Sequence, residues 1–375
     1  MSVKPLPPGS TRRRHEPDWE PPIPGRRRIL NTWDEYMAMA KRVIARFDHQ
    51  FELRHFDYVH PVKLQKCSPR FRKAYPVKVA YTDWGDPASN APMVVCVGGV
   101  ENTAMRFNYL AADLEAHFRV VCMDWVGRGR SGWMSDQRDY SLATYVEQLR
   151  QLIDHLGGGP VILLGSSMGG SAAIELAARH PKMVSRLILN DIGPFIPKGR
   201  RQRRSQTLAR HYVFRDPADL LRKIGASQKN DGPVSDDIRF NVTFHQTKWS
   251  DEEGGRIYRH DTRALQAFRD DAQTSLDQWK LWAKVRCPVL LIHGMMSDAL
   301  LPPTIRRMKE TKDISIMHVP DTGHTPVLSD RNQNWFIHEW LMDHTSAKEW
   351  TVLHAKLRDD PKTSVRLVKP AATAA

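Results

Sequence analysis

One short segment constrains this chain most: Gly165-Ser166-Ser167-Met168-Gly169-Gly170, because of what stands on either side of it. The apolar run before it, 160–164, is typical of a buried parallel strand, and the stretch after it, 171–179, is rich in helix formers at helical spacing. A G-x-S-x-G pattern between a strand and a helix predicts a sharp turn that lifts the Ser167 hydroxyl above a sheet. Ser167 is therefore the candidate nucleophile.

Apolar runs alternate with helical stretches from about residue 74 onward. The expected strands are 77–81, 93–97, 120–123, 161–164, 187–189, 289–292 and 314–319, and the expected helices are 103–117, 141–156, 168–180, 303–311 and 331–343. This alternation predicts an α/β fold with a mostly parallel sheet and helices on both faces. A gap of about a hundred residues follows the fifth run. It is too long for a loop and indicates an inserted subdomain.

Five parts are expected along the chain. These are a disordered basic and Pro-rich extension at 1–30, an N-terminal helical extension at 31–73, a core formed by 74–193 together with 285–345, a helical cap at 194–284, and a C-terminal tail at 346–375. Within the second part, a capping box at Thr32 and apolar residues at helical spacing predict one amphipathic helix over 32–48.

The partners of a nucleophilic serine are expected downstream. A serine hydroxyl needs a base to remove its proton and an acid to orient that base. Asp298 lies in the loop that leaves the strand 289–292, and His324 lies in the loop that leaves the strand 314–319. Asp191, at the end of the run 187–189, is an alternative acid.

With these residues in place, the chain resembles the α/β-hydrolase superfamily over residues 74–345. The resemblance is carried by Trp84-Gly85-Asp86-Pro87, Val97-Gly98-Gly99-Val100, Asp124-x-x-Gly127-x-Gly129-x-Ser131, the segment at Ser167, and the loops of Asp298 and Gly323-His324. It implies the α/β-hydrolase fold with a cap and a serine esterase site, without a metal or other cofactor.

The same resemblance assigns roles to residues. Ser167 is the nucleophile, His324 the general base and then acid, and Asp298 the residue that orients the imidazole. The backbone N–H groups of Val100 and Met168 form the oxyanion hole. One departure stands out: members of the family usually carry His-Gly where this chain has Gly98-Gly99.

The resemblance implies hydrolysis of a small or medium carboxylic ester through an acyl-enzyme on Ser167. Two alternatives use the same triad: a carbon–carbon bond hydrolase acting on ring-cleavage products, and an acyltransferase. The first typically has Asn before the nucleophile and an aromatic residue after the histidine, whereas this chain has Ser166 and Thr325. A dinucleotide site at 127–132, which reads G-x-G-x-x-G, is rejected because no helix opens at its third glycine.

The charge of +14 is unevenly distributed. Residues 1–70 carry 14 basic and 8 acidic side chains, and residues 194–284 carry 18 and 12. Since no RNA-binding motif or zinc-finger spacing accompanies the arginine runs, no specific nucleic-acid partner is predicted, and an anionic ester substrate is one option. The oligomeric state is not predicted.

The four cysteines are scattered and indicate a reducing compartment: Cys67, Cys96, Cys122 and Cys287. No signal-peptide core and no apolar stretch of transmembrane length is found, so a cytoplasmic location is expected.

Overall fold

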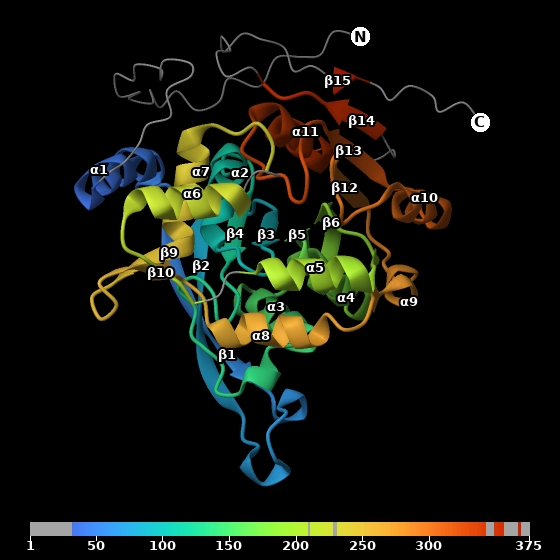
Figure 1. Ribbon diagram of the computed structural model, residues 1–375. Helices are drawn as coiled ribbons and strands as arrows, with labels where there is room; N and C mark the ends of the chain where they lie inside the picture. Colours follow the sequence, from blue (N-terminus) through green and yellow to red (C-terminus); the bar gives the residue numbers. More distant parts are fainter. Residues whose placement is uncertain (1–31, 209–210, 228–230, 343–348, 356–366, 369–375) are drawn as a thin grey trace.

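A ten-stranded sheet forms the centre of the molecule, with strand order β1-β2-β4-β3-β5-β6-β12-β13-β14-β15 (Figure 1). The computed structural model describes residues 32–208, 211–227, 231–342, 349–355 and 367–368. The strands of the sheet are β1 Phe51–His60, β2 Tyr75–Trp84, β3 Met93–Val97, β4 Arg119–Met123, β5 Val161–Ser166, β6 Val184–Asn190, β12 Val289–Gly294, β13 Ser315–Val319, β14 Glu349–Val352 and β15 Leu367–Val368. From β4 to β14 the neighbouring strands run parallel, while β1 with β2, β2 with β4, and β14 with β15 pair antiparallel.

Helices cover both faces of this sheet, because its central strands are apolar on both sides. Val95 of β3 belongs to the core beneath α3 (Leu142–His155) and α4 (Met168–Arg179), whereas its neighbour Cys96 belongs to the core beneath α2 (Asn108–Leu114) and α11 (Arg331–Met342). The architecture predicted from the sequence, a mostly parallel sheet between two layers of helices, is observed.

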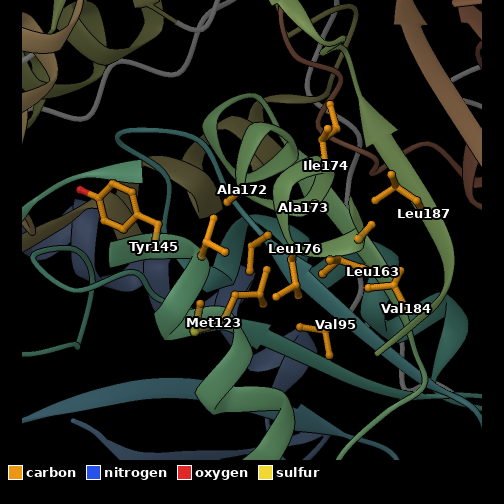
Figure 2. Packing of buried hydrophobic residues seen from close by; sticks show 14 of the residues in the cluster. Val95, Met123, Tyr145, Leu163, Ala172, Ala173, Ile174, Leu176, Val184 and Leu187 are labelled. Carbon is orange, nitrogen blue, oxygen red and sulfur yellow. The ribbon is translucent and has the colours of Figure 1, made fainter. Parts of the chain in front are cut away.

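Small side chains bring α4 close to the sheet. Figure 2 shows Ala172, Ala173 and Leu176 of this helix gathered with Val95 and Leu163 of the sheet beneath. All five are fully buried. This packing fixes the helix whose N-terminus meets Ser167, since a close-packed interior leaves little room for displacement.

The segment between β6 and β12 is the one expected to form a cap, and it is called the cap below. Its helices are α5 Lys198–Thr207, α6 Pro217–Ser227, α7 Asp236–Gln246, α8 Thr262–Asp271 and α9 Trp279–Trp282. Short strands join them: β8 Val213–Phe214, β9 Thr247–Ser250 and β10 Gly255–Tyr258 form one small sheet, and β7 Phe195–Ile196 pairs with β11 Leu276–Asp277. The cap, expected to be helical, is thus mixed. After β12, α10 Pro302–Thr311 returns the chain to β13.

The N-terminal helix α1 (Trp33–Ile44) packs against the cap. It begins at Thr32, whose side chain accepts from the Glu35 N–H while the Glu35 side chain accepts from the Thr32 N–H. The residues that follow were expected to extend a helical segment, yet β1 forms a ten-residue antiparallel pair with β2. Its even-numbered residues from Phe56 onward are buried, which is the period-two pattern of a strand with one solvated face.

The C-terminal part also differs from the expectation. Within 346–375, expected to lie outside the core as a tail, β14 and β15 extend the central sheet. The extension predicted at 1–30 lies outside the described residues. No helix among the described residues is both long and apolar enough to cross a membrane.

Candidate active site

Ser167 occupies the sharp turn between β5 and α4. Its backbone has φ 52° and ψ −118°, a conformation that L-residues adopt rarely and that costs about 1–3 kcal/mol. Two glycines make the turn possible. A Cβ at Gly165 would lie 2.5 Å from Gly170 Cα, and one at Gly169 would lie 2.4 Å from the Val97 carbonyl oxygen. The G-x-S-x-G spacing therefore has a steric cause.

His324 bridges Ser167 and Asp191. Its Nε2 lies 2.9 Å from Ser167 Oγ, and its Nδ1 lies 2.7 Å from Asp191 Oδ2. The sheet register brings these groups together. Ser166 at the end of β5 is paired with Asn190 at the end of β6, so that Ser167 and Asp191 leave the sheet beside each other. His324 follows β13, on the far side of β12.

Asp298 was expected to orient His324, and the structure contradicts this placement. The Asp298 side chain is 60% exposed, and it accepts a hydrogen bond from Arg200 Nε at 2.9 Å. The loop after β12 places it beside Arg200 at the cavity wall. Ser297 Oγ accepts from the N–H groups of Ala299 and Leu300, which closes a tight turn around Asp298. Asp191, the alternative acid, is the carboxylate that lies beside the His324 imidazole.

The Asp191 carboxylate is fully buried and is held by three donors. Besides His324, the Gly294 N–H donates to Oδ1 at 3.0 Å, and Ser297 Oγ donates to Oδ2 at 2.5 Å. Sequence reasoning missed the role of Ser297. Its place shortly after a strand that neighbours β6 is the signal that could have found it. Burial lowers the pKa of His293 nearby, although the Asp191 charge acts in the opposite direction.

The loop after β3 passes directly over Ser167. A Cβ at Gly99 would lie 3.3 Å from Ser167 Cβ, a contact tight enough that a larger residue here would require its neighbours to shift by a few tenths of an ångström. Where the family usually has His-Gly, this loop is held by one of its own side chains and by two from the segment after β4. Asn102 Oδ1 accepts from the Gly99 N–H at 3.0 Å, and Trp125 Nε1 donates to the Gly98 carbonyl at 2.8 Å. Arg128 Nε donates to the carbonyl of Val100 at 2.9 Å.

A cavity of about 970 Å³ opens above Ser167 between the core and the cap. Val100 and Met168, the two expected oxyanion-hole residues, line it together with Ser167 and His324. Its remaining wall is partly apolar and partly charged, and includes Ala264, Ala267, Phe268, Leu276, Arg106, Arg128, Arg200, Arg201, Arg203, Arg204 and Asp298.

Most aromatic residues of the cap lie elsewhere. Phe240 packs with α1, and Trp282 belongs to the core beneath the sheet, so that Phe268 is the cap aromatic among the described lining residues. The described residues hold no group of three or more His, Cys, Asp or Glu side chains placed to bind a metal ion.

Comparisons with known proteins bear on the fold and the family of the chain. Residues 91–331 match the family described as the alpha/beta hydrolase fold. The chain is 32% identical to the 3-hydroxybutyrate-oligomer hydrolase of Cupriavidus necator over 266 residues, which cover 68% of this chain and 90% of that protein. An alpha/beta hydrolase from Novosphingobium aromaticivorans superposes with a TM-score of 0.66 at 22% identity, covering 78% of this chain and 98% of its own. A candidate hydrolase from Rickettsia typhi gives a TM-score of 0.71 at 24% identity, with coverage of 78% and 99%.

Proposed function

The chain belongs to the α/β-hydrolase family, and from this premise we propose that it hydrolyses carboxylic esters through an acyl-enzyme on Ser167. The observation that carries the proposal is the hydrogen-bond chain from Ser167 through His324 to Asp191 at the floor of the cavity. This is the arrangement in which a serine hydroxyl is activated by a base that a buried carboxylate orients. Asp191 therefore replaces Asp298 as the proposed acid.

Each group has one role in the proposed reaction. His324 Nε2 takes the Ser167 proton while Oγ attacks the ester carbonyl carbon, and the backbone N–H groups of Val100 and Met168 donate to the oxyanion. His324 then protonates the departing alcohol. In the second half, water loses a proton to His324 and attacks the acyl carbon, which releases the acid and restores Ser167. Asp191 keeps the imidazole oriented and stabilises its charged form.

A short oligoester of a hydroxy acid is the substrate class that we favour. The Cupriavidus necator relative is named for such a substrate. The cavity volume lies in the range that holds small-molecule ligands, and its apolar residues suit short aliphatic chains. Carbon–carbon bond hydrolysis and acyl transfer use the same triad, and no specific feature of the cavity favours either. A cytoplasmic location stays a prediction from the sequence.

The first experiment identifies the nucleophile. A fluorophosphonate probe and nitrophenyl butyrate are applied to the wild type, to Ser167→Ala and to Ser166→Ala. We expect Ser167→Ala to lose labelling and to lower kcat by about 10⁴-fold or more. Ser166 is the matched control, because it is the adjacent serine and its buried hydroxyl accepts from Asn190. Labelling that persists in Ser167→Ala would contradict the proposal.

A further inference from the structure

The loop Gly127-Arg128-Gly129, rejected as a nucleotide site, is fixed between the core and the cap. The Gly129 N–H donates to the Arg259 carbonyl, and the Asp261 N–H donates to the Gly127 carbonyl, both at 2.8 Å. Both glycines have positive φ, and a Cβ at Gly129 would lie 2.1 Å from a carboxylate oxygen of Asp124. The backbone on either side of Arg128 is therefore held in place.

The Arg128 side chain is only 1% exposed and forms no ion pair with any residue that the structure describes. Besides its bond to the Val100 carbonyl, Nη1 donates to the Val126 carbonyl at 3.0 Å and to the Tyr145 hydroxyl at 2.6 Å. Nη2 is buried and has no hydrogen-bond partner among the described residues. The rings of Tyr140 and Tyr145 also lie beside the guanidinium, with centroids 5.8 Å and 5.2 Å from Cζ, but they leave the two N–H groups of Nη2 without an acceptor among the described residues.

Acidic side chains of this region have cationic partners of their own. Asp261 lies 2.8 Å from Arg263 and accepts from the Tyr140 hydroxyl, and Glu101 pairs with Arg204. Arg106, another buried arginine of the cavity wall, pairs with Asp231 at 3.2 Å. Arg128 differs from Arg106 in having no such counter-charge among the residues that the structure describes.

A buried guanidinium without a counter-charge is costly unless a ligand supplies one. Arg128 lines the same cavity as Ser167 and His324, and its Nε contacts the loop that carries the proposed oxyanion hole. We propose that Arg128 binds a free carboxylate of the substrate, so that the enzyme selects esters that also carry an acid group. This proposal rests on the proposed ester hydrolysis at Ser167.

The chemistry of the group favours a carboxylate. Arginine stays charged at every physiological pH, and its N–H groups match carboxylate oxygens in direction and spacing. One guanidinium balances one negative charge. A hydroxy-acid oligoester carries one free carboxylate, on the alcohol part of its terminal ester bond, whereas a dicarboxylic monoester carries its carboxylate on the acyl part.

The experiment compares substrates that differ only in this charge. The dimer of 3-hydroxybutyrate and its methyl ester share the same internal ester and place the charge on the alcohol part. Mononitrophenyl succinate and nitrophenyl butyrate place it on the acyl part. The readout is the ratio of kcat/KM for the charged and neutral member of each pair, with products of the dimer separated by chromatography.

We expect Arg128→Met to lower the ratio of kcat/KM values about tenfold or more in one pair of esters. Arg128→Lys should lower it less, because lysine keeps the positive charge but cannot donate two parallel hydrogen bonds to a carboxylate. The pair that responds identifies the part of the ester that carries the carboxylate. Arg130→Met is the matched control: it lies in the same loop, outside the described lining of the cavity, and should leave both ratios unchanged. Unchanged ratios in Arg128→Met for both pairs would overturn the proposal.

Ionic strength separates this effect from the arginines of α5. A buried charge is screened little, so the preference due to Arg128 should persist between about 0.05 M and about 0.5 M NaCl. A preference that disappears with salt would assign the selectivity to Arg200, Arg203 and Arg204 instead, and would overturn the role of Arg128.

Binding measurements keep this proposal distinct from the proposed reaction. Titration calorimetry with 3-hydroxybutyrate should detect binding to Ser167→Ala and a loss of about tenfold or more in affinity when Arg128→Met is added. If the wild type hydrolyses none of the four esters, the proposed function fails, while this difference in affinity would still support Arg128. Equal affinity in both proteins would overturn it. Thermal unfolding of Arg128→Met and Arg128→Lys verifies that each variant is folded.

Discussion

At the scale of single residues, an acid that orients an imidazole must itself be held in one position. Asp191 meets this need through the Gly294 N–H and the Ser297 hydroxyl, and it lies fully buried. Asp298 has the arginine of a cap helix as its partner and is mostly exposed to solvent. The two carboxylates therefore differ in what they can do for His324.

Asp191→Asn should lower kcat for nitrophenyl butyrate by about 10³–10⁴-fold, because an amide can hold the imidazole in the wrong tautomer. The control is Asp298→Asn, the same substitution at the other carboxylate. It should change kcat by less than about threefold, since an exposed ion pair contributes little. Initial-rate kinetics at saturating ester provide both values. A larger loss of kcat in Asp298→Asn than in Asp191→Asn would indicate that Asp298 is the acid.

Sequence reasoning could predict two members of this site because local patterns specify them. Ser167 stands in a turn whose glycines are needed sterically, and His324 follows β13, the last of the strands that the sequence predicts. The choice of acid depends on which loop turns inward. The turn at Ser297 decides this, because the Ser297 hydroxyl accepts from the Ala299 N–H and donates to Asp191. The hydrogen bond to Asp191 joins two loops that follow strands far apart in the sequence. No local pattern encodes it.

At the scale of elements, α1 shows what an amphipathic pattern can and cannot specify. The spacing predicted a helix over 32–48, and the structure has α1 over Trp33–Ile44. The pattern specifies which face is buried but not the surface that covers it. In the structure this surface is the cap, where Tyr36 packs with Phe240 at a ring-centroid distance of 4.8 Å.

Tyr36→Ala should lower the free energy of unfolding by about 3–5 kcal/mol, the usual cost of removing a large buried aromatic side chain. Met37→Ala, on the exposed side of the same helix, is the matched control and should cost less than about 0.5 kcal/mol beyond the change in helix propensity. Urea unfolding followed by circular dichroism measures both. Similar losses in the two variants would mean that α1 contributes through its own helicity and not through its contact with the cap.

At the scale of the whole molecule, the sequence shows where the basic residues stand along the chain, but it does not show which of them have acidic partners. The arginine run of α5 faces the cavity, and three of its members have acidic partners: Arg200 with Asp298, Arg201 with Asp271, and Arg204 with Glu101. A count of charges predicted a basic cap, but it could not show that most of this run is compensated. Three arginines outside this run, Arg130, Arg256 and Arg259, instead act on the buried His245 of the cap.

Acid should destabilise the protein through two buried histidines of the cap. Burial, reinforced by Arg130, Arg259 and Arg256, lowers the pKa of His245 from 6.5 to about 3, and burial lowers the pKa of His260 to about 4. Between about pH 6.5 and these lowered pKa values, each of the two histidines is protonated in the unfolded chain but neutral in the folded protein. The stabilising contribution is therefore complete above about pH 6.5 and is lost as the pH falls.

The expected loss from each histidine between about pH 7.5 and about pH 5.5 is about 1.4 kcal/mol in the free energy of unfolding, because on average about half a proton per site is taken up on unfolding over these two pH units. His245→Phe removes one titrating group, so the pH-dependent loss should shrink by about that amount, whatever the variant's stability at pH 7.5. Substitution of the exposed His55 by Gln is the control and should leave the loss as in the wild type. Urea unfolding at the two pH values provides the comparison. An equal loss in the wild type and His245→Phe would show that His245 already binds a proton in the folded cap, against the burial and the three arginines that surround it.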